Sequence, residues 1–108
     1  MSAAISAMEL SARLVDTNPP MLLDVREPEE HELVHLPNSR LIPLRQIPHR
    51  MGELADWRSR ELVVYCHHGI RSQHAIAFLQ QHGFTQLLNL SGGIDAWSRE
   101  VDRAALRY

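Results

Sequence analysis

The segment ELVVYCHHGIRSQHAIAFLQQHG, residues 61–83, joins the clearest strand pattern of the chain to a helical one. The β-branched and aromatic residues before Cys66 are typical of a buried strand. From Arg71 onward the apolar residues recur on one helical face, and His82 and Gly83 mark the end of that helix. The only cysteine of the chain therefore lies where a strand ends and a helix begins. In parallel α/β sheets, ligands bind at this position.

Strand and helix patterns alternate along the rest of the chain. Ser6 and Glu9 have the spacing of a capping box, which predicts a helix of about ten residues behind them. Further strands are expected at 21–25, 40–44 and 84–90, and further helical segments from Pro28 for one turn, at 45–54 with Pro48 in the first turn, and at 91–101. This order predicts an α/β layer structure with a mostly parallel sheet.

Length and composition describe an ordinary globular protein. The chain has 108 residues, of which 44% are hydrophobic and 22% charged, so we expect one domain over residues 1–108. A net charge of -2 argues against nucleic acid or an anionic membrane as the main partner. The sequence shows no signal peptide and no apolar run approaching the roughly 20 residues of a membrane span. With its lone thiol, the chain is expected in a reducing, cytoplasmic compartment.

The loop after Cys66 has the properties of an anion cradle. No proline occurs from His67 to Ser72, so every backbone N–H is available, and Gly69 permits dihedrals that turn them inward. These amides and the charge of Arg71 would favour the reactive thiolate form of the cysteine, and equally an anion bound in front of it. Loop and position alone leave a structural and a reactive thiol evenly balanced.

Four blocks of sequence resemble the rhodanese (sulfurtransferase) family, in the order in which that family has them. YCHHGIRS at 65–72 resembles its active-site loop, and DVREPEEHE at 24–32 resembles its Asp-Val-Arg segment. HLPNSRLIPL at 35–44 and LSGGIDAW at 90–97 resemble two further signatures of the family. The four blocks together are far more specific than a Cys-x-x-Gly motif alone.

This resemblance implies a rhodanese-like three-layer α/β fold, with a sheet of about five strands and helices on both faces. It implies that the thiolate of Cys66 takes the outer sulfur of a small anionic donor such as thiosulfate, becomes a persulfide, and passes that sulfur to cyanide, a thiol or a protein acceptor. The expected substrate-binding residues are His67, His68, Gly69, Ile70, Arg71 and Ser72, with Asp24 and Arg26 in support. No metal or organic cofactor is required, and we expect a monomer or weak dimer.

Some positions leave the function open. His67 stands where thiosulfate-preferring members often carry Arg, so the donor is undetermined, and Asn38 replaces a frequent Gly. Cysteine-dependent phosphatases and arsenate reductases are rivals, but the phosphatases use a loop one residue longer than the Cys-x4-Arg of Cys66 and Arg71. A non-enzymatic persulfide carrier or partner-binding module is the second alternative.

Several residues also have a purely structural interpretation. For Ser72 we favour a role in beginning and capping the helix, and for Trp97 core packing. Glycines in SGG, residues 91–93, are better explained by close backbone packing than by phosphate binding. His31 and His35 have helical spacing, yet the nearby proline places them in an irregular segment, which argues against zinc.

Overall fold

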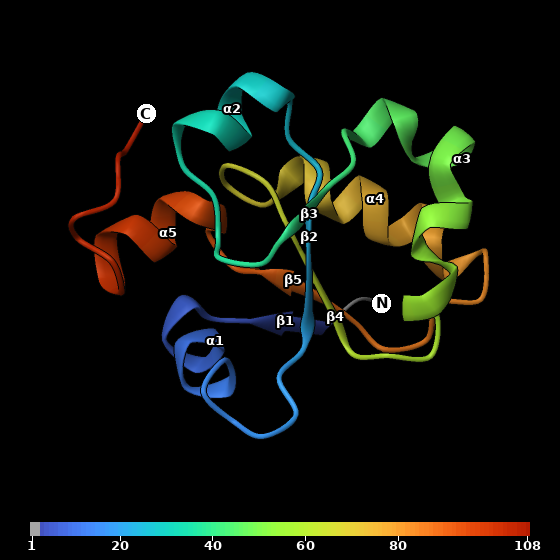
Figure 1. Cartoon of the computed structure of the whole chain (residues 1–108), viewed down its shortest axis with the longest axis horizontal. Coiled ribbons are helices and arrows are strands. Elements are labelled where there is room, and N and C mark those ends of the chain that lie inside the picture. The colour runs from blue at the N-terminus through green and yellow to red at the C-terminus, as the bar shows by residue number, and fades with distance from the viewer. Residues whose placement is uncertain (1–2) are drawn as a thin grey trace.

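Five parallel strands form a single sheet in the computed structural model, which describes residues 3–108 (Figure 1). The strand order is β1-β5-β4-β2-β3, and every neighbouring pair is parallel. The strands are β1 (Ala3–Ile5), β2 (Met21–Asp24), β3 (Arg40–Leu41), β4 (Leu62–Tyr65) and β5 (Leu87–Leu90). The predicted parallel α/β sheet of about five strands is confirmed.

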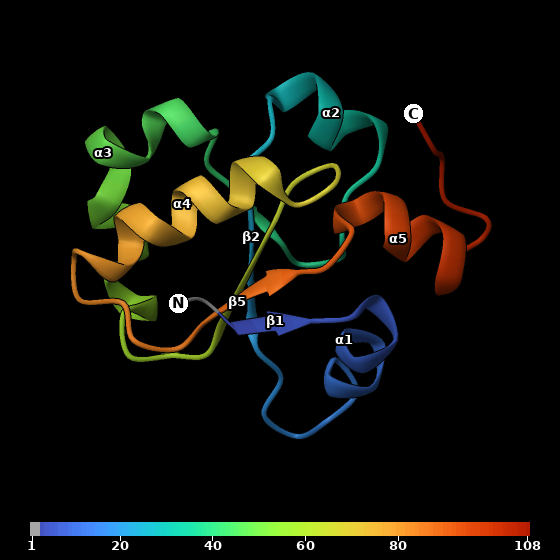
Figure 2. The ribbon, with the colours of Figure 1, turned by 180° about the vertical axis from the view of Figure 1, so that it is seen from behind.

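Helices cover both faces of the sheet, as predicted (Figures 1 and 2). They are α1 (Ala7–Arg13), α2 (Pro28–Leu33), α3 (Ile47–Arg50), α4 (Ile70–Gln80) and α5 (Gly93–Glu100), with 3-10 turns at η1 (Leu44–Gln46) and η2 (Met51–Trp57). Side chains of α3, η2 and α4 belong to one buried cluster, and those of α1 and α5 to the other. No helix within residues 3–108 is long and apolar enough to span a membrane.

The central strand β4 shows why its sequence is a continuous apolar run. Leu62 and Val64 point into one buried cluster, whereas Val63 and Tyr65 point into the other. A strand covered on both faces has no side chain facing water, so its hydrophobicity does not alternate. Cys66 follows directly at its carboxyl end.

The predicted local features at the starts of α1 and α3 are present, although α1 is shorter than expected. The capping box is present, since the Ser6 hydroxyl accepts from the Glu9 amide at 3.0 Å and the Ser6 amide donates to the Glu9 carboxylate at 2.9 Å. The helix behind it has seven residues, not ten. Pro48 lies in the first turn of α3, as expected.

Two features of the sheet differ from the prediction. Of the strand expected at 40–44, only Arg40–Leu41 pairs with β2. Strand β1 was not predicted, because three residues are too few to show a period. These residues form a strand only through a tertiary contact, because Ala3–Ile5 pairs with β5 at the edge of the sheet.

Candidate active site

Two backbone amides point at the sulfur of Cys66. The Gly69 N–H donates to Sγ at 3.0 Å and the Ser72 N–H at 3.4 Å. Gly69, the N-cap of α4, has a φ of 119°, a backbone conformation that residues other than glycine rarely adopt. This turn brings its amide inward, toward the sulfur. The inward turn expected for this loop is therefore present around the sulfur.

The side chain of Asn89 in β5 forms hydrogen bonds with two residues of the loop, and sequence reasoning did not identify it. Its Oδ1 accepts from the Ser72 hydroxyl at 2.6 Å, and its Nδ2 donates to the Gly69 carbonyl at 3.2 Å. The capping role favoured for Ser72 is wrong: Gly69 caps α4, while Ser72 is fully buried with its hydroxyl 3.4 Å from the sulfur. The available signal for Asn89 was an amide inside the apolar strand LLNL.

The start of α5 fixes the loop from the other side. The Ile94 N–H donates to the Cys66 carbonyl at 2.9 Å, and the Asp95 N–H donates to the His67 carbonyl at 3.1 Å. Gly93 packs so closely that an added Cβ would overlap both carbonyl groups. The packing role predicted for SGG is confirmed, and Trp97 lies in the core as expected.

Arg71 lines the pocket beside Cys66, but its guanidinium is paired. Nη1 and Nη2 donate to the two carboxylate oxygens of Glu30 at 2.6 and 2.9 Å. Hydrogen bonds from Arg71 are the main cause that lowers the pKa of Glu30 to about 2. Sequence reasoning missed Glu30, which lies 41 residues away on α2.

Asp24 and Arg26, which were expected in a supporting role, form an ion pair with each other. Both side chains are fully buried, with Nη2 to Oδ2 at 2.7 Å and Nε to Oδ1 at 2.9 Å. Burial opposes the charge of Arg26, yet its pKa is raised by the hydrogen bonds and the charge of Asp24. The same guanidinium donates to the Val34 carbonyl at 2.6 Å and to the Tyr108 hydroxyl at 2.8 Å. The pair thus supports the segment after α2 and residue 108, not the cysteine loop directly.

The remaining loop residues surround a pocket of about 190 Å³, which is lined by Cys66, His67, His68, Ile70 and Arg71. Cys66 itself is only 1% exposed. The His67 ring stacks on Tyr108 with centroids 4.0 Å apart. Burial, helped by the neighbouring His68, lowers the pKa of His67, so this ring is neutral at pH 7.

One group of potential metal ligands is found in the part of the chain that the structure describes. His31 and His35 stack, but Nδ1 of His31 faces Asp24 at 2.8 Å. His67, His68 and Asp95 have potential ligand atoms within 4.8 Å of one another. The two imidazole rings of His67 and His68 lie 4.0 Å apart and are tilted by 32°.

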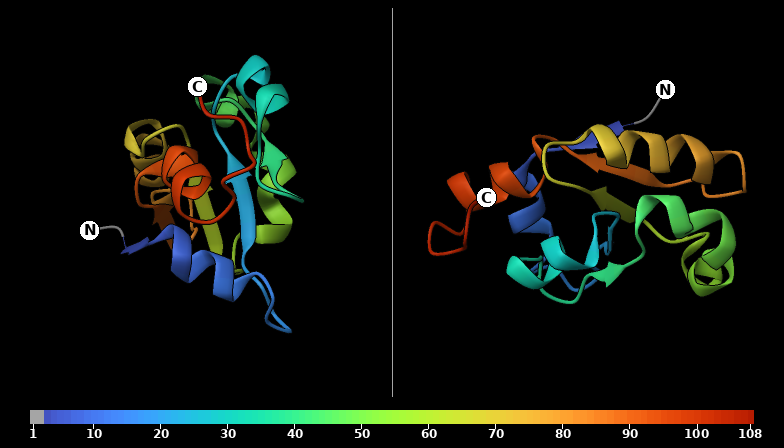
Figure 3. Two further views of the ribbon diagram at one scale, coloured as in Figure 1. Left: turned by 90° about the vertical axis from the view of Figure 1, so that its left-hand side faces the viewer. Right: turned by 90° about the horizontal axis from the view of Figure 1, so that it is seen from above.

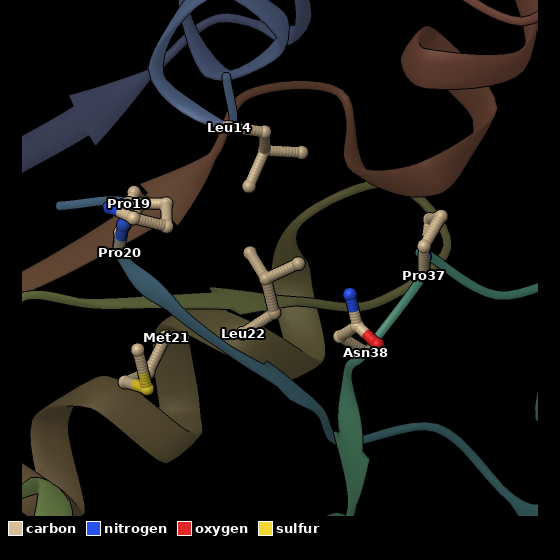
Figure 4. Close-up of a pocket in the computed structure, with 7 residues that line it drawn as sticks. All are labelled: Leu14, Pro19, Pro20, Met21, Leu22, Pro37 and Asn38. Atoms are coloured by element: carbon tan, nitrogen blue, oxygen red, sulfur yellow. The ribbon is translucent and has the colours of Figure 1, made fainter. Parts of the chain in front are cut away.

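A larger pocket, of about 420 Å³, lies at the amino end of β2 and away from the cysteine (Figure 4). Leu14, Pro20 and Leu22 point into it, and Asn38 lines one side. Asn38 has a φ of 65°, which explains how it can replace glycine here. No thiol, imidazole or charged group lines this pocket.

Comparison with known proteins identifies the family. The model of the rhodanese-like domain matches residues 6–100, and the chain belongs to that family. It is 42% identical over 95 residues to a sulfurtransferase of Allochromatium vinosum, covering 88% of this chain and 87% of that protein. A rhodanese-like domain protein of Staphylococcus aureus superposes with a TM-score of 0.83 at 27% identity, covering 98% of both chains.

Other relatives are larger proteins. The probable adenylyltransferase/sulfurtransferase MoeZ of Mycobacterium tuberculosis is 36% identical over 81% of this chain, which spans only 22% of that relative. The putative sulfur carrier protein YrkF of Bacillus subtilis is 32% identical over 89% of this chain and 51% of its own length. These similarities support sulfur transfer as the general chemistry of the chain.

Proposed function

We propose that this protein is a sulfurtransferase that takes a sulfane sulfur from a small anionic donor such as thiosulfate and works through a persulfide on Cys66. The observation that carries the proposal is the pair of amides, from Gly69 and Ser72, directed at Sγ. Such donors stabilise a thiolate, and they would equally stabilise the charge of a persulfide. The pocket in front of the sulfur has room for a small donor.

The chemistry needs no further group. The Cys66 thiolate attacks the outer sulfur of thiosulfate, a new S–S bond forms, and the S–S bond of thiosulfate breaks with its electron pair leaving on sulfite. Cyanide or a thiolate then attacks the outer sulfur of the persulfide. Thiocyanate or a new persulfide leaves, and the thiolate is restored. Because the cycle starts from a free thiol, we place it in a reducing compartment such as the cytoplasm.

The site argues against phosphoryl transfer. A transferred phosphoryl group carries charge on three equatorial oxygens, which a phosphatase loop and its arginine must meet together. Here the loop is one residue shorter, and both nitrogens of the Arg71 fork are bound to Glu30. An oxyanion would therefore have to displace a carboxylate from the arginine.

The test is the intact mass of the purified protein before and after thiosulfate, followed by cyanide. We expect a gain of one sulfur atom that cyanide removes as thiocyanate, and no gain in Cys66→Ser, which cannot form a persulfide. Sulfur loading with no turnover to cyanide or thiols would indicate the carrier function instead. No loading from any donor would refute the proposal, and hydrolysis of a phosphate ester would then point to the phosphatase.

A further inference from the structure

The charge of Arg71 is neutralised inside the site. Its two terminal nitrogens bind both oxygens of Glu30, and the side chains are only 36% and 19% exposed. Such a bidentate pair has the geometry in which an arginine binds a carboxylate most strongly. The pair contributes no net charge toward the pocket that Arg71 lines.

Two further hydrogen bonds hold the pair in place. The Tyr108 hydroxyl donates to Oε2 of Glu30 at 2.7 Å, and the Glu27 amide donates to Oε1 at 3.0 Å. Tyr108 is itself held by Arg26 and by the ring of His67. The chain after α5 thus returns past the active site to reach α2, where its end lies in Figures 1 and 3. Because its partners come from separate segments, this is not a mobile surface ion pair.

The other residues around the pocket do not restore a positive charge. His67 is neutral at pH 7, because burial lowers its pKa. The His68 ring lies 3.7 Å from the Asp95 carboxylate, and Ile70 offers an apolar side chain that is 68% exposed. Of the described residues that line the pocket, none presents a fixed cation without a carboxylate beside it.

We propose that Glu30, held by Tyr108, selects the sulfur donor by keeping Arg71 paired, so that the site favours singly charged sulfane donors over the thiosulfate dianion. The preferred class comprises thiosulfonates and persulfides, whose one negative charge lies on the sulfur that is transferred. Glu30 acts here as a positioning residue through Arg71. This inference rests on the proposed sulfurtransferase function and names the donor class of the same site.

The test compares two donors that differ by one charge. Thiosulfate and methanethiosulfonate both deliver their outer sulfur to Cys66, releasing sulfite and methanesulfinate respectively, and thiocyanate formation from cyanide measures both. In Glu30→Gln the KM for thiosulfate should fall about tenfold and that for methanethiosulfonate about threefold, since the Coulomb energy scales with donor charge. The turnover number should stay within about twofold, and added salt should shrink the difference.

Glu29→Gln is the matched control, because it removes the same charge from an exposed position of the same helix. Its two KM values should match those of the unaltered protein within about twofold, since exposed charges are well screened. Tyr108→Phe removes one hydrogen bond to Glu30 and keeps the ring on His67, so its thiosulfate KM should fall by about twofold to threefold.

An unchanged or higher thiosulfate KM in Glu30→Gln would overturn the inference, and so would an equal shift for both donors. If Glu30→Gln does not fold, Tyr108→Phe decides in the same way through its thiosulfate KM. Failure of the unaltered protein to take sulfur from either donor would refute the proposed function itself, which separates the two conclusions.

Discussion

Replacing Gly93 by alanine tests whether close packing of α5 holds the cysteine loop in its reactive shape. Gly93 has a φ of 61°, and a Cβ at this position would overlap the backbone carbonyls of Cys66 and His67. Those carbonyls accept the amides of Ile94 and Asp95, so the loop and the helix cannot separate without losing both hydrogen bonds. The added methyl group should therefore displace the loop that carries the sulfur.

The expected cost has two parts. A left-handed backbone conformation costs alanine about 1–2 kcal/mol. Forcing an extra methyl group into packed backbone costs a further 1–3 kcal/mol, roughly. A loss of about 2–5 kcal/mol would lower the Tm of a domain of this size by roughly 10–20 °C.

The assay combines thermal unfolding with the rate of persulfide formation at a temperature where the variant is folded. Gly52→Ala is the control, since nothing lies within 4 Å of its added Cβ. Its Tm should change by no more than about 3 °C, because surface substitutions usually stay within about 0.5 kcal/mol. A Gly93→Ala protein with the Tm of the control and a normal rate of sulfur loading would refute this account of the site.

Three further changes test the buried polar contacts. Asp24→Asn removes the counter-charge of the fully buried Arg26, so urea unfolding should show a loss of about 3–5 kcal/mol; a loss below about 1 kcal/mol would contradict the ion pair. Asn89→Leu deprives Ser72 and the Gly69 carbonyl of their partner, and mass spectrometry should show slower sulfur loading together with a stability loss of about 1–3 kcal/mol. The third is pH: since the pKa of Glu30 falls from 4.5 to about 2 on folding, the stability it provides is present above pH 4.5 and is lost as the pH falls toward 2. Unfolding free energies measured from pH 5 to 3 should therefore decline more steeply in the unaltered protein than in Glu30→Gln, and parallel curves would show that Glu30 is not coupled to folding.

The fold was largely predictable, because its main signals are local. The capping box of Ser6, the two-faced apolar run of β4 and the helix after Cys66 each follow from neighbouring residues, and the structure contains all three elements. That helix, α4, ends at Gln80, a little before the stop expected at Gly83. Strand β1 shows the limit. Its three residues become a strand only by pairing with β5, which is a contact between distant parts of the chain.

Of the candidate site, only the loop after Cys66 could be predicted from the sequence. Cys66 and Gly69 lie three positions apart, so spacing and the known freedom of glycine predict the turn around the sulfur. Asn89 reaches the same turn from 20 residues away. An asparagine in an apolar strand indicates a satisfied buried amide, but the sequence does not say which backbone group satisfies it.

The electrostatics of Arg71 show the same difference between what the sequence predicts and what the structure contains. The Cys-x4-Arg spacing places Arg71 beside the sulfur, and the sequence alone shows no partner for its charge. The structure pairs that charge with Glu30, so the decisive quantity is the net charge of two groups and not the presence of one. A motif records which residue occurs at a position, whereas the Coulomb energy of a donor depends on every charge within a few ångströms of it. Donor preference in this family member should therefore be sought in the partner of the arginine as much as in the loop itself.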